Sequence, residues 1–150
     1  MDMKNTLNFK YILSKRKSYQ KQSPFVIEST VRDREKFNSD KYCPRLLLWD
    51  PMQQYPSLKI NCPHHDVVLN STDRWSGTKH SLPRRLYDIH GCVFLVACKY
   101  RCESAEGTHF QIASDEGILN QVKDQGIDIP FSLQHVAGVT TKMLNYIIHR

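Results

Sequence analysis

The sequence predicts an α+β domain in which short, mostly antiparallel strands come first and short helices follow. Three observations support this prediction. Between residues 57 and 113, short runs alternate apolar and polar residues and are separated by turn-forming residues, as is typical of strands. The most apolar run, residues 92–100 (CVFLVACKY), has the length and β-branched content of a central strand. After residue 114, the apolar residues change to helical spacing.

The expected strands form hairpins. They are residues 57–61 with a return at 67–69, residues 84–89 with the central run 92–100 across a His90-Gly91 turn, and residues 108–113, which pair antiparallel with the central run. Residues 130–136 fit a strand or a helix equally well.

Two helices are expected after the strands. Ser114 is a candidate N-cap for a helix over residues 115–123, which Gln125-Gly126 ends. Thr140 or Thr141 can cap a last helix whose apolar side chains share one face: Met143, Leu144, Ile147 and Ile148. Either this face packs on the domain itself, or a protein partner or a missing C-terminal domain covers it.

The positive charge is concentrated at the N-terminus. The formal net charge is +6, and residues 1–24 hold six Lys or Arg against one acid. We therefore expect residues 1–41 to be a basic, largely flexible arm and residues 42–150 to be one domain. Any phosphate affinity that the net charge suggests is therefore expected in this arm. Lys15-Arg16-Lys17 fits a nuclear signal or a solvated arm.

The composition disfavours several protein classes. No run approaches the roughly 18 apolar residues of a membrane span, and the N-terminus has no apolar signal-peptide core, so no membrane partner is expected. Five cysteines make an odd number in a chain without a secretion signal, which disfavours a disulfide framework. We expect an intracellular protein, with a nuclear location allowed, whose cysteines are reduced or bind a metal.

Two Cys/His pairs predict a structural zinc site, which needs four nitrogen or sulfur ligands. Cys62 and His65 form a C-x-x-H knuckle, and Cys102 and His109 would meet across a β-hairpin. These four residues are the predicted ligands of Zn²⁺. His64 is an alternative to His65, although the i, i+3 spacing favours His65.

The other cysteines are interpreted as structural. Cys98 would add a thiolate beside Cys102, but a continuous strand would separate the two by roughly 13 Å. We therefore expect Cys98 to be a buried thiol. Cys43 has no nearby partner, and Cys92 lies in an expected strand.

A second set of residues places cations beside an aromatic ring, a combination that can contact phosphates and stack on bases of DNA or RNA. This candidate nucleic-acid-binding set is Arg74, Trp75, Lys79, Arg84 and Arg85. The alternative is that Trp75 packs in the domain while the cations face solvent.

Known catalytic motifs are absent from the sequence. There is no Gly-rich phosphate loop, nucleophile elbow or H-E-x-x-H motif. Four protein ligands would leave the zinc no open position for a water molecule. A catalytic zinc would require one of the four to be a bystander, and His109 is the weakest of them. The sequence therefore favours a binding module over an enzyme.

Several segments carry a family resemblance: LWDP (48–51), CPHH (62–65), DRW (73–75), PRRLYD (83–88), LVACKYRC (95–102), His109, SDEGIL (114–119) and PFSLQHVAGVT (130–140). In this order, over residues 45–145, they resemble a zinc-ribbon-like domain of unknown function found in transposon-derived, often multidomain animal proteins. The resemblance implies zinc-ribbon-like hairpins that use Cys62 with position 65, and Cys102 with His109. His65 stands where the family commonly has a cysteine.

The same resemblance implies a function. It suggests a nucleic-acid- or protein-binding accessory of a mobile-element-derived protein. The alternatives are a non-catalytic fragment of a larger transposase- or nuclease-like enzyme, and an inactive remnant.

Overall fold

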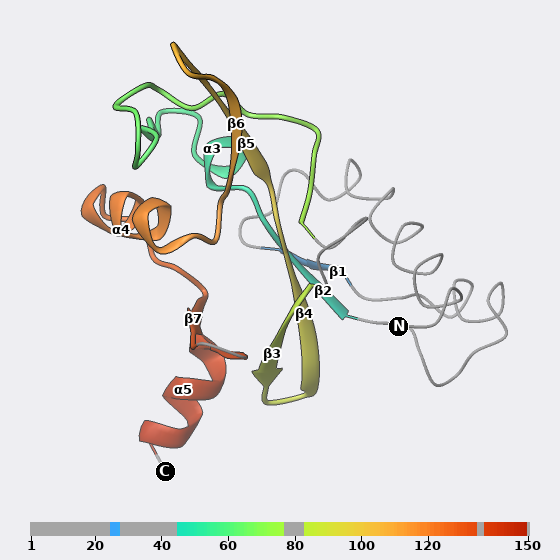
Figure 1. Cartoon of the computed structure of the whole chain (residues 1–150). Coiled ribbons are helices and arrows are strands. Elements are labelled where there is room, and N and C mark those ends of the chain that lie inside the picture. The colour runs from blue at the N-terminus through green and yellow to red at the C-terminus, as the bar shows by residue number, and fades with distance from the viewer. Residues whose placement is uncertain (1–24, 28–44, 77–82, 135–136, 150) are drawn as a thin grey trace, which may run out of the picture.

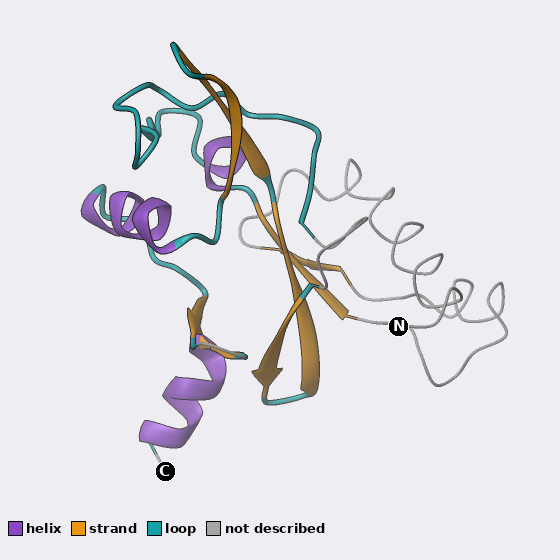
Figure 2. Cartoon of the chain, in the orientation of Figure 1, coloured by secondary structure: helices purple, strands orange, loops and turns teal. Residues whose placement is uncertain are grey.

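The computed structural model describes residues 25–27, 45–76, 83–134 and 137–149. These residues form a mixed α+β fold of two sheets and short helices (Figures 1 and 2). The predicted fold class is confirmed. Most of the expected basic arm, residues 1–41, lies outside the described residues. The exception is β1 (Phe25–Ile27), which pairs with the main sheet.

The main sheet has six strands in the order β1-β2-β4-β3-β8-β7. Besides β1, they are β2 (Arg45–Trp49), β3 (Arg84–Asp88), β4 (Gly91–Ala97), β7 (Phe131–Leu133) and β8 (Gly138–Thr140). β7 places a strand within the ambiguous segment 130–136, of which residues 135 and 136 lie outside the described part of the chain. Two of the pairings, β2 with β4 and β3 with β8, are parallel, whereas the others are antiparallel.

The predicted central strand is divided into two. β4 ends at Ala97 and β5 (Lys99–Ser104) begins after Cys98, so residues 92–100 serve two different sheets. The backbone N–H of Cys98 donates to the carbonyl of Trp49 at 2.9 Å, while its carbonyl accepts from Ala113 at 2.8 Å. Cys98 therefore joins the main sheet to the hairpin of β5 and β6 (Gly107–Ile112), which Figure 1 shows as a continuation of β4.

Residues 60–69 form a tight hairpin-like turn, here called the knuckle, beside β5. The N–H of Cys62 donates to the carbonyl of Val67 at 2.7 Å, and that of Leu69 to Ile60 at 2.8 Å. The left-handed conformation of Asp66 (φ 49°) helps to reverse the chain. Just beyond the knuckle, Asn70 and Arg101 of β5 exchange backbone hydrogen bonds of 2.9 and 2.8 Å.

Both predicted helices are present, one with a shifted cap, whereas the short helix that follows β2 was not predicted. α3 (Pro51–Gln54) follows β2, and α4 (Glu116–Asp124) begins after Asp115 rather than after Ser114. The Asp115 carboxylate instead accepts from the N–H of Ile112 at 2.9 Å. The left-handed Gly126 (φ 77°) follows the end of α4, as the Gln125-Gly126 pair predicts.

The last helix, α5 (Thr141–Ile148), is capped by Thr140, one of the two predicted caps, whose hydroxyl accepts from the N–H of Met143 at 3.2 Å. Its expected apolar face is covered in part by the described residues: Met143 and Leu144 are half-buried, whereas Ile147 and Ile148 are 57% and 71% exposed. None of the described helices is long and apolar enough to cross a membrane.

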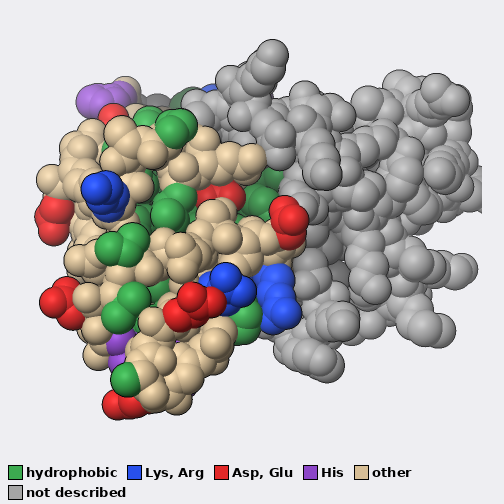
Figure 3. Space-filling view, turned by 90° about the horizontal axis from the view of Figure 1, so that it is seen from above, with side chains coloured by type: hydrophobic (Ala, Val, Ile, Leu, Met, Phe, Trp, Pro, Cys, Tyr) green, Lys and Arg blue, Asp and Glu red, His purple; other side chains and the backbone are tan. Residues whose placement is uncertain are grey.

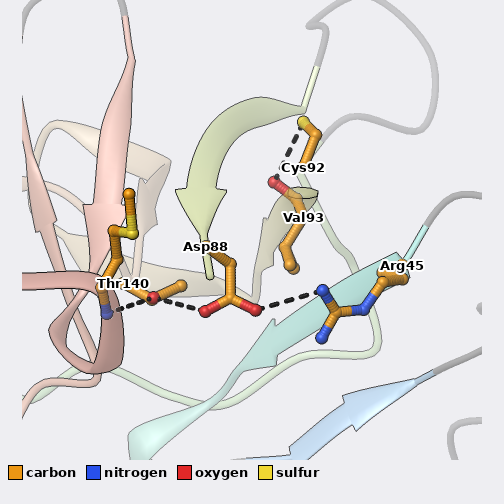
Figure 4. Close-up of polar contacts among 6 residues, drawn as sticks. Arg45, Asp88, Cys92, Val93 and Thr140 are labelled. Carbon is orange, nitrogen blue, oxygen red and sulfur yellow. Dashed lines mark hydrogen bonds and ion pairs between the residues drawn. The ribbon is translucent and has the colours of Figure 1, made fainter. Parts of the chain in front are cut away.

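A polar cluster links the N-terminus of α5 to strands β2 and β3 of the main sheet. The carboxylate of Asp88, at the end of β3, accepts from the hydroxyl of Thr140 at 2.7 Å and from the guanidinium of Arg45 on β2 at 3.1 Å (Figure 4). One buried carboxylate thus connects strands β2 and β3 with the N-terminus of α5.

Candidate metal centre

Cys62, His65 and Cys102 come together where the knuckle meets β5. Cys62 and His65 stand at the two ends of the C-x-x-H turn, so the local chain reversal brings them together. Cys102 lies on β5, one residue beyond the Asn70–Arg101 bridge that holds the knuckle against this strand. The cluster is therefore made by one local turn and one tertiary pairing.

The distances within this cluster fit a tetrahedral metal ion. The Nδ1 atom of His65 lies 3.4 Å from the sulfur of Cys62 and 3.5 Å from the sulfur of Cys102. With ordinary zinc–sulfur and zinc–nitrogen bond lengths, a tetrahedron separates a sulfur and a nitrogen ligand by about 3.5 Å. All three ligand atoms lie within 4.8 Å of one another. The three side chains could therefore share one ion without a large rearrangement.

The surroundings of the cluster favour one thiolate. Burial by itself raises the pKa of Cys62, but hydrogen bonds from the His64 backbone and the His65 side chain outweigh burial and lower this pKa overall. Burial raises the pKa of Cys102, and the neighbouring Cys62 raises it further. Since a thiolate is the form that binds metals, Cys62 is the better prepared of the two ligands.

The ring of His65 is held at both nitrogens. Hydrogen bonding to Cys62 raises its pKa against the opposing effect of burial, and Glu106 adds to the increase. Nε2 lies 3.5 Å from a carboxylate oxygen of Glu106, in the turn between β5 and β6. A carboxylate at the outer nitrogen places the proton on Nε2, which leaves the Nδ1 lone pair for a metal. The sequence did not single out Glu106, since only the hairpin register brings it to His65.

The fourth predicted ligand, His109, lies beside the cluster and is not part of it. His109 is the cross-strand partner of Cys102, as the hairpin predicted. Its ring stacks on that of His65, with centroids 5.2 Å apart and planes 13° apart. Two imidazoles that bind one ion both contain it in their planes. Nearly parallel rings would then have to be coplanar, so this stacked arrangement does not place His109 on the same ion.

The alternative ligands lie elsewhere. His64 is exposed, with its ring 6.2 Å from that of His65. Cys98 is fully buried, and its thiol donates to the carbonyl of Thr72 at 3.2 Å. Burial raises the pKa of Cys98 to about 12, which keeps it a neutral thiol. Among the described residues, the group around Cys62 contains neither of them.

Four of the five nucleic-acid candidates are described, and they differ in exposure and in direction. Trp75 is only 5% exposed and packs in the core, so its ring offers no face to a base. Arg84 and Arg85 are successive residues of β3 and therefore point to opposite faces of the sheet. The guanidinium of Arg74 lies 4.6 Å from the centroid of the Phe110 ring, and Lys79 lies outside the described residues. On the described part of the face in Figure 3, acidic and basic side chains are interspersed.

A hollow of about 630 Å³ opens at the metal cluster, between the knuckle and the turn of the β5–β6 hairpin. Its lining includes Cys62, His65 and Glu106. The hollow thus borders two of the three candidate ligands, whereas Cys102 is fully buried. No protein-family model matches this chain, and no significant match was found among curated proteins or solved structures.

Proposed function

We propose that this chain is a zinc-binding domain in which the metal fastens the knuckle to the β5–β6 hairpin. The observation that carries the proposal is the position of His65 Nδ1, 3.4 and 3.5 Å from two cysteine sulfurs that come from different parts of the chain. Two thiolates and an imidazole form a soft donor set that suits zinc better than calcium or magnesium.

The role proposed for the metal is structural. The knuckle contains little regular structure. Its described backbone hydrogen bonds either close the knuckle itself or, at the adjoining Asn70, join it to β5. A metal bound by Cys62 and Cys102 would cross-link these two segments. The surface stabilised in this way would serve a binding partner, in agreement with the binding module that the sequence favours.

Metal content of the purified full-length chain tests this proposal. The parent is expected to hold about one equivalent of zinc, because structural sites bind their metal tightly. Replacement of a proposed ligand, by Cys62→Ser, Cys102→Ser or His65→Ala, should reduce this to less than about half.

Two matched controls come from the same chain. Cys92→Ser removes a partly buried thiol of β4 that is outside the cluster, and His64→Ala removes the imidazole next to His65. Both variants should keep the parent's zinc. A parent that purifies without zinc and does not take it up, or controls that lose as much as Cys62→Ser, would contradict the proposal.

A further inference from the structure

The β5–β6 hairpin has one buried face and one open face. Side chains alternate between the two faces of a strand, and Tyr100 and Cys102 of β5 are fully buried. Lys99 and Arg101 point to the other face, where the side chain of Arg101 is 48% exposed. Phe110 is the cross-strand partner of Arg101, so its ring lies on the same face, and it is 38% exposed. The open face thus carries an aromatic ring beside two cations.

A third cation reaches this face from the segment that follows the knuckle. The N–H of Lys99 donates to the carbonyl of Arg74 at 2.8 Å, which holds Arg74 alongside β5. The hydroxyl of Thr72 accepts from the N–H of Arg74 at 3.1 Å and donates to the carbonyl of Lys99. The guanidinium of Arg74 lies over the ring of Phe110 on β6, 4.6 Å from its centroid. The side chain of Arg74 therefore crosses β5 and rests on the aromatic ring.

These four side chains are here called the hairpin face: Arg74, Lys99, Arg101 and Phe110. The acids on or beside it are Glu103 and Asp73, so cations outnumber carboxylates. Arg101 Nη2 lies 3.1 Å from a carboxylate oxygen of Glu103, and both side chains are about half exposed, so solvent weakens this pair. A guanidinium has five N–H donors, and one contact leaves the others for a phosphate.

The chemistry of the hairpin face fits a single-stranded nucleic acid. Unpaired bases can stack on an aromatic ring or on the plane of a guanidinium, and both groups are present in the contact between Arg74 and Phe110. The neighbouring cations can bind the phosphates of the same strand. An acidic peptide would use the cations equally well, but it has no base to place against the ring of Phe110. The exposed ring therefore favours a nucleic acid over an acidic peptide.

We propose that the hairpin face binds single-stranded DNA or RNA, with a base against Arg74 and Phe110 and phosphates at Lys99 and Arg101. The inference deepens the proposed function by naming the partner. It rests on that function, because the knuckle that the metal fastens leads directly into the segment of Arg74. DNA and RNA share the chemistry that this face recognises.

Fluorescence anisotropy with the full-length, zinc-loaded chain tests the stacking contact. The probes are labelled oligothymidylate of about twelve nucleotides and an abasic strand of equal length, which has the phosphates but no bases. The parent should bind the strand with bases about tenfold more tightly. Phe110→Leu should abolish most of this preference, since leucine is apolar but has no ring. Tyr87→Leu is the matched control, because Tyr87 is an exposed aromatic residue of β3 in the main sheet, and it should bind as the parent does.

The salt dependence of binding tests the phosphate contacts. Arg101→Gln should lower the slope of log affinity against log salt concentration by about 0.7, the contribution of one phosphate contact in a single strand. Arg85→Gln, which removes an exposed cation of β3, should leave the slope unchanged. The cations of residues 1–24 contribute equally to all these proteins, so their effect cancels from the comparison.

A third probe separates the two kinds of nucleic acid. Tighter binding of oligouridylate than of oligothymidylate assigns the hairpin face to RNA, and the reverse order assigns it to DNA.

Three results would overturn the inference. They are equal affinity of the parent for the strands with and without bases, equal effects of Phe110→Leu and Tyr87→Leu, and an oligoglutamate peptide that binds with the same dependence on Phe110. The last result would assign the face to an acidic protein.

The zinc content of each sample separates this inference from the zinc site. A zinc-loaded parent whose binding does not depend on Phe110 would contradict the inference and leave the zinc site standing. Binding that depends on Phe110 in a parent without zinc would support the hairpin face and contradict the zinc site alone.

Discussion

The carboxylate of Asp88 is almost buried and accepts from two side-chain donors, the hydroxyl of Thr140 and the guanidinium of Arg45. Burial by itself raises its pKa, but the hydrogen bonds from Thr140 and Arg45 outweigh burial and hold the pKa below its usual value. A lowered pKa in the folded state means that ionised Asp88 stabilises the fold. This stabilisation is complete above the pKa of the unfolded chain and is lost as the pH falls through the folded-state pKa.

Asp88→Asn should therefore destabilise the protein in a pH-dependent way. At neutral pH we expect a loss of about 1–3 kcal/mol, since asparagine can still accept from Thr140 but no longer pairs with Arg45. The difference from the parent should shrink as the pH falls below about 3.9, the usual pKa of an aspartate. Denaturant unfolding of both proteins from pH 7 downwards measures this difference.

Metal loss in acid affects the parent and Asp88→Asn equally, so it cancels from their difference. A stability difference that stays constant down to the lowest pH would show that the charge of Asp88 has no role.

Single residues differ in how well their roles can be predicted from the sequence. Cys62 and His65 were recognised because an i, i+3 turn is local, and the apolar run predicted that Cys98 is buried. Cys102 needed the additional assumption of a hairpin, which is correct. The positions of Glu106 and His109 around the ring of His65 depend on side-chain packing across that hairpin, which no spacing encodes.

Helix α4 positions the knuckle through polar contacts with its backbone. The side-chain amide of Gln121 accepts from the N–H of Asn61 and donates to its carbonyl, both at 2.9 Å. Gln125 donates to the carbonyl of Lys59 at 2.9 Å. Gly117 lets the helix approach closely, since a Cβ there would lie 2.9 Å from Pro63 Cγ. The segment that leads into Cys62 is thus held by hydrogen bonds between its backbone and side chains of α4.

Gln121→Ala should consequently weaken metal binding, although Gln121 is not one of the proposed ligands. Removal of the amide leaves the N–H and the carbonyl of Asn61 without this partner. Asn61 directly precedes the proposed ligand Cys62. We expect the zinc affinity to fall by about tenfold, a value typical for loss of an outer contact. Competition with a chromophoric chelator measures the affinity.

Asn120→Ala is the matched control for this change. It raises the helix propensity of α4, by more than Gln121→Ala does, at the neighbouring position, for which no hydrogen bond to the knuckle is seen. Equal affinities for Gln121→Ala and Asn120→Ala would show that α4 does not position the knuckle.

Elements were predicted well where the signal was local. The β5–β6 hairpin, the turn between β3 and β4, and helices α4 and α5 follow the alternation, caps and helical spacing of the sequence. The parallel pairings of β2 and β8 were not predicted, because they join segments far apart in the chain and no local pattern specifies the neighbour. The break at Cys98 was missed for a similar reason, since an apolar run does not show where a strand changes sheets.

At the scale of the whole molecule, the metal cluster lies at one end of a continuous core. The buried side chains of β2 and β4 form the part of the core that lies against the main sheet. Cys62 and Cys102 belong to the part of the same core beneath the knuckle. The hairpin is joined to the main sheet by Trp49, whose indole N–H donates to the carbonyl of Ala113 at 3.0 Å, and by the backbone of Cys98. These links do not involve the metal ligands.

Metal removal should therefore open the knuckle and leave the main sheet intact. A metal held at 100 times its dissociation constant adds about 2.7 kcal/mol, or about a hundredfold of amide protection, to the parts of the fold that depend on it. Hydrogen exchange before and after chelation should show this loss at the amides of Cys62 and Leu69. The amides of β4 should change little, since their partners lie in the main sheet. Unfolding of the main sheet on chelation would show that the core cannot stand without the metal, and unchanged exchange in the knuckle would show that the metal does not fasten it.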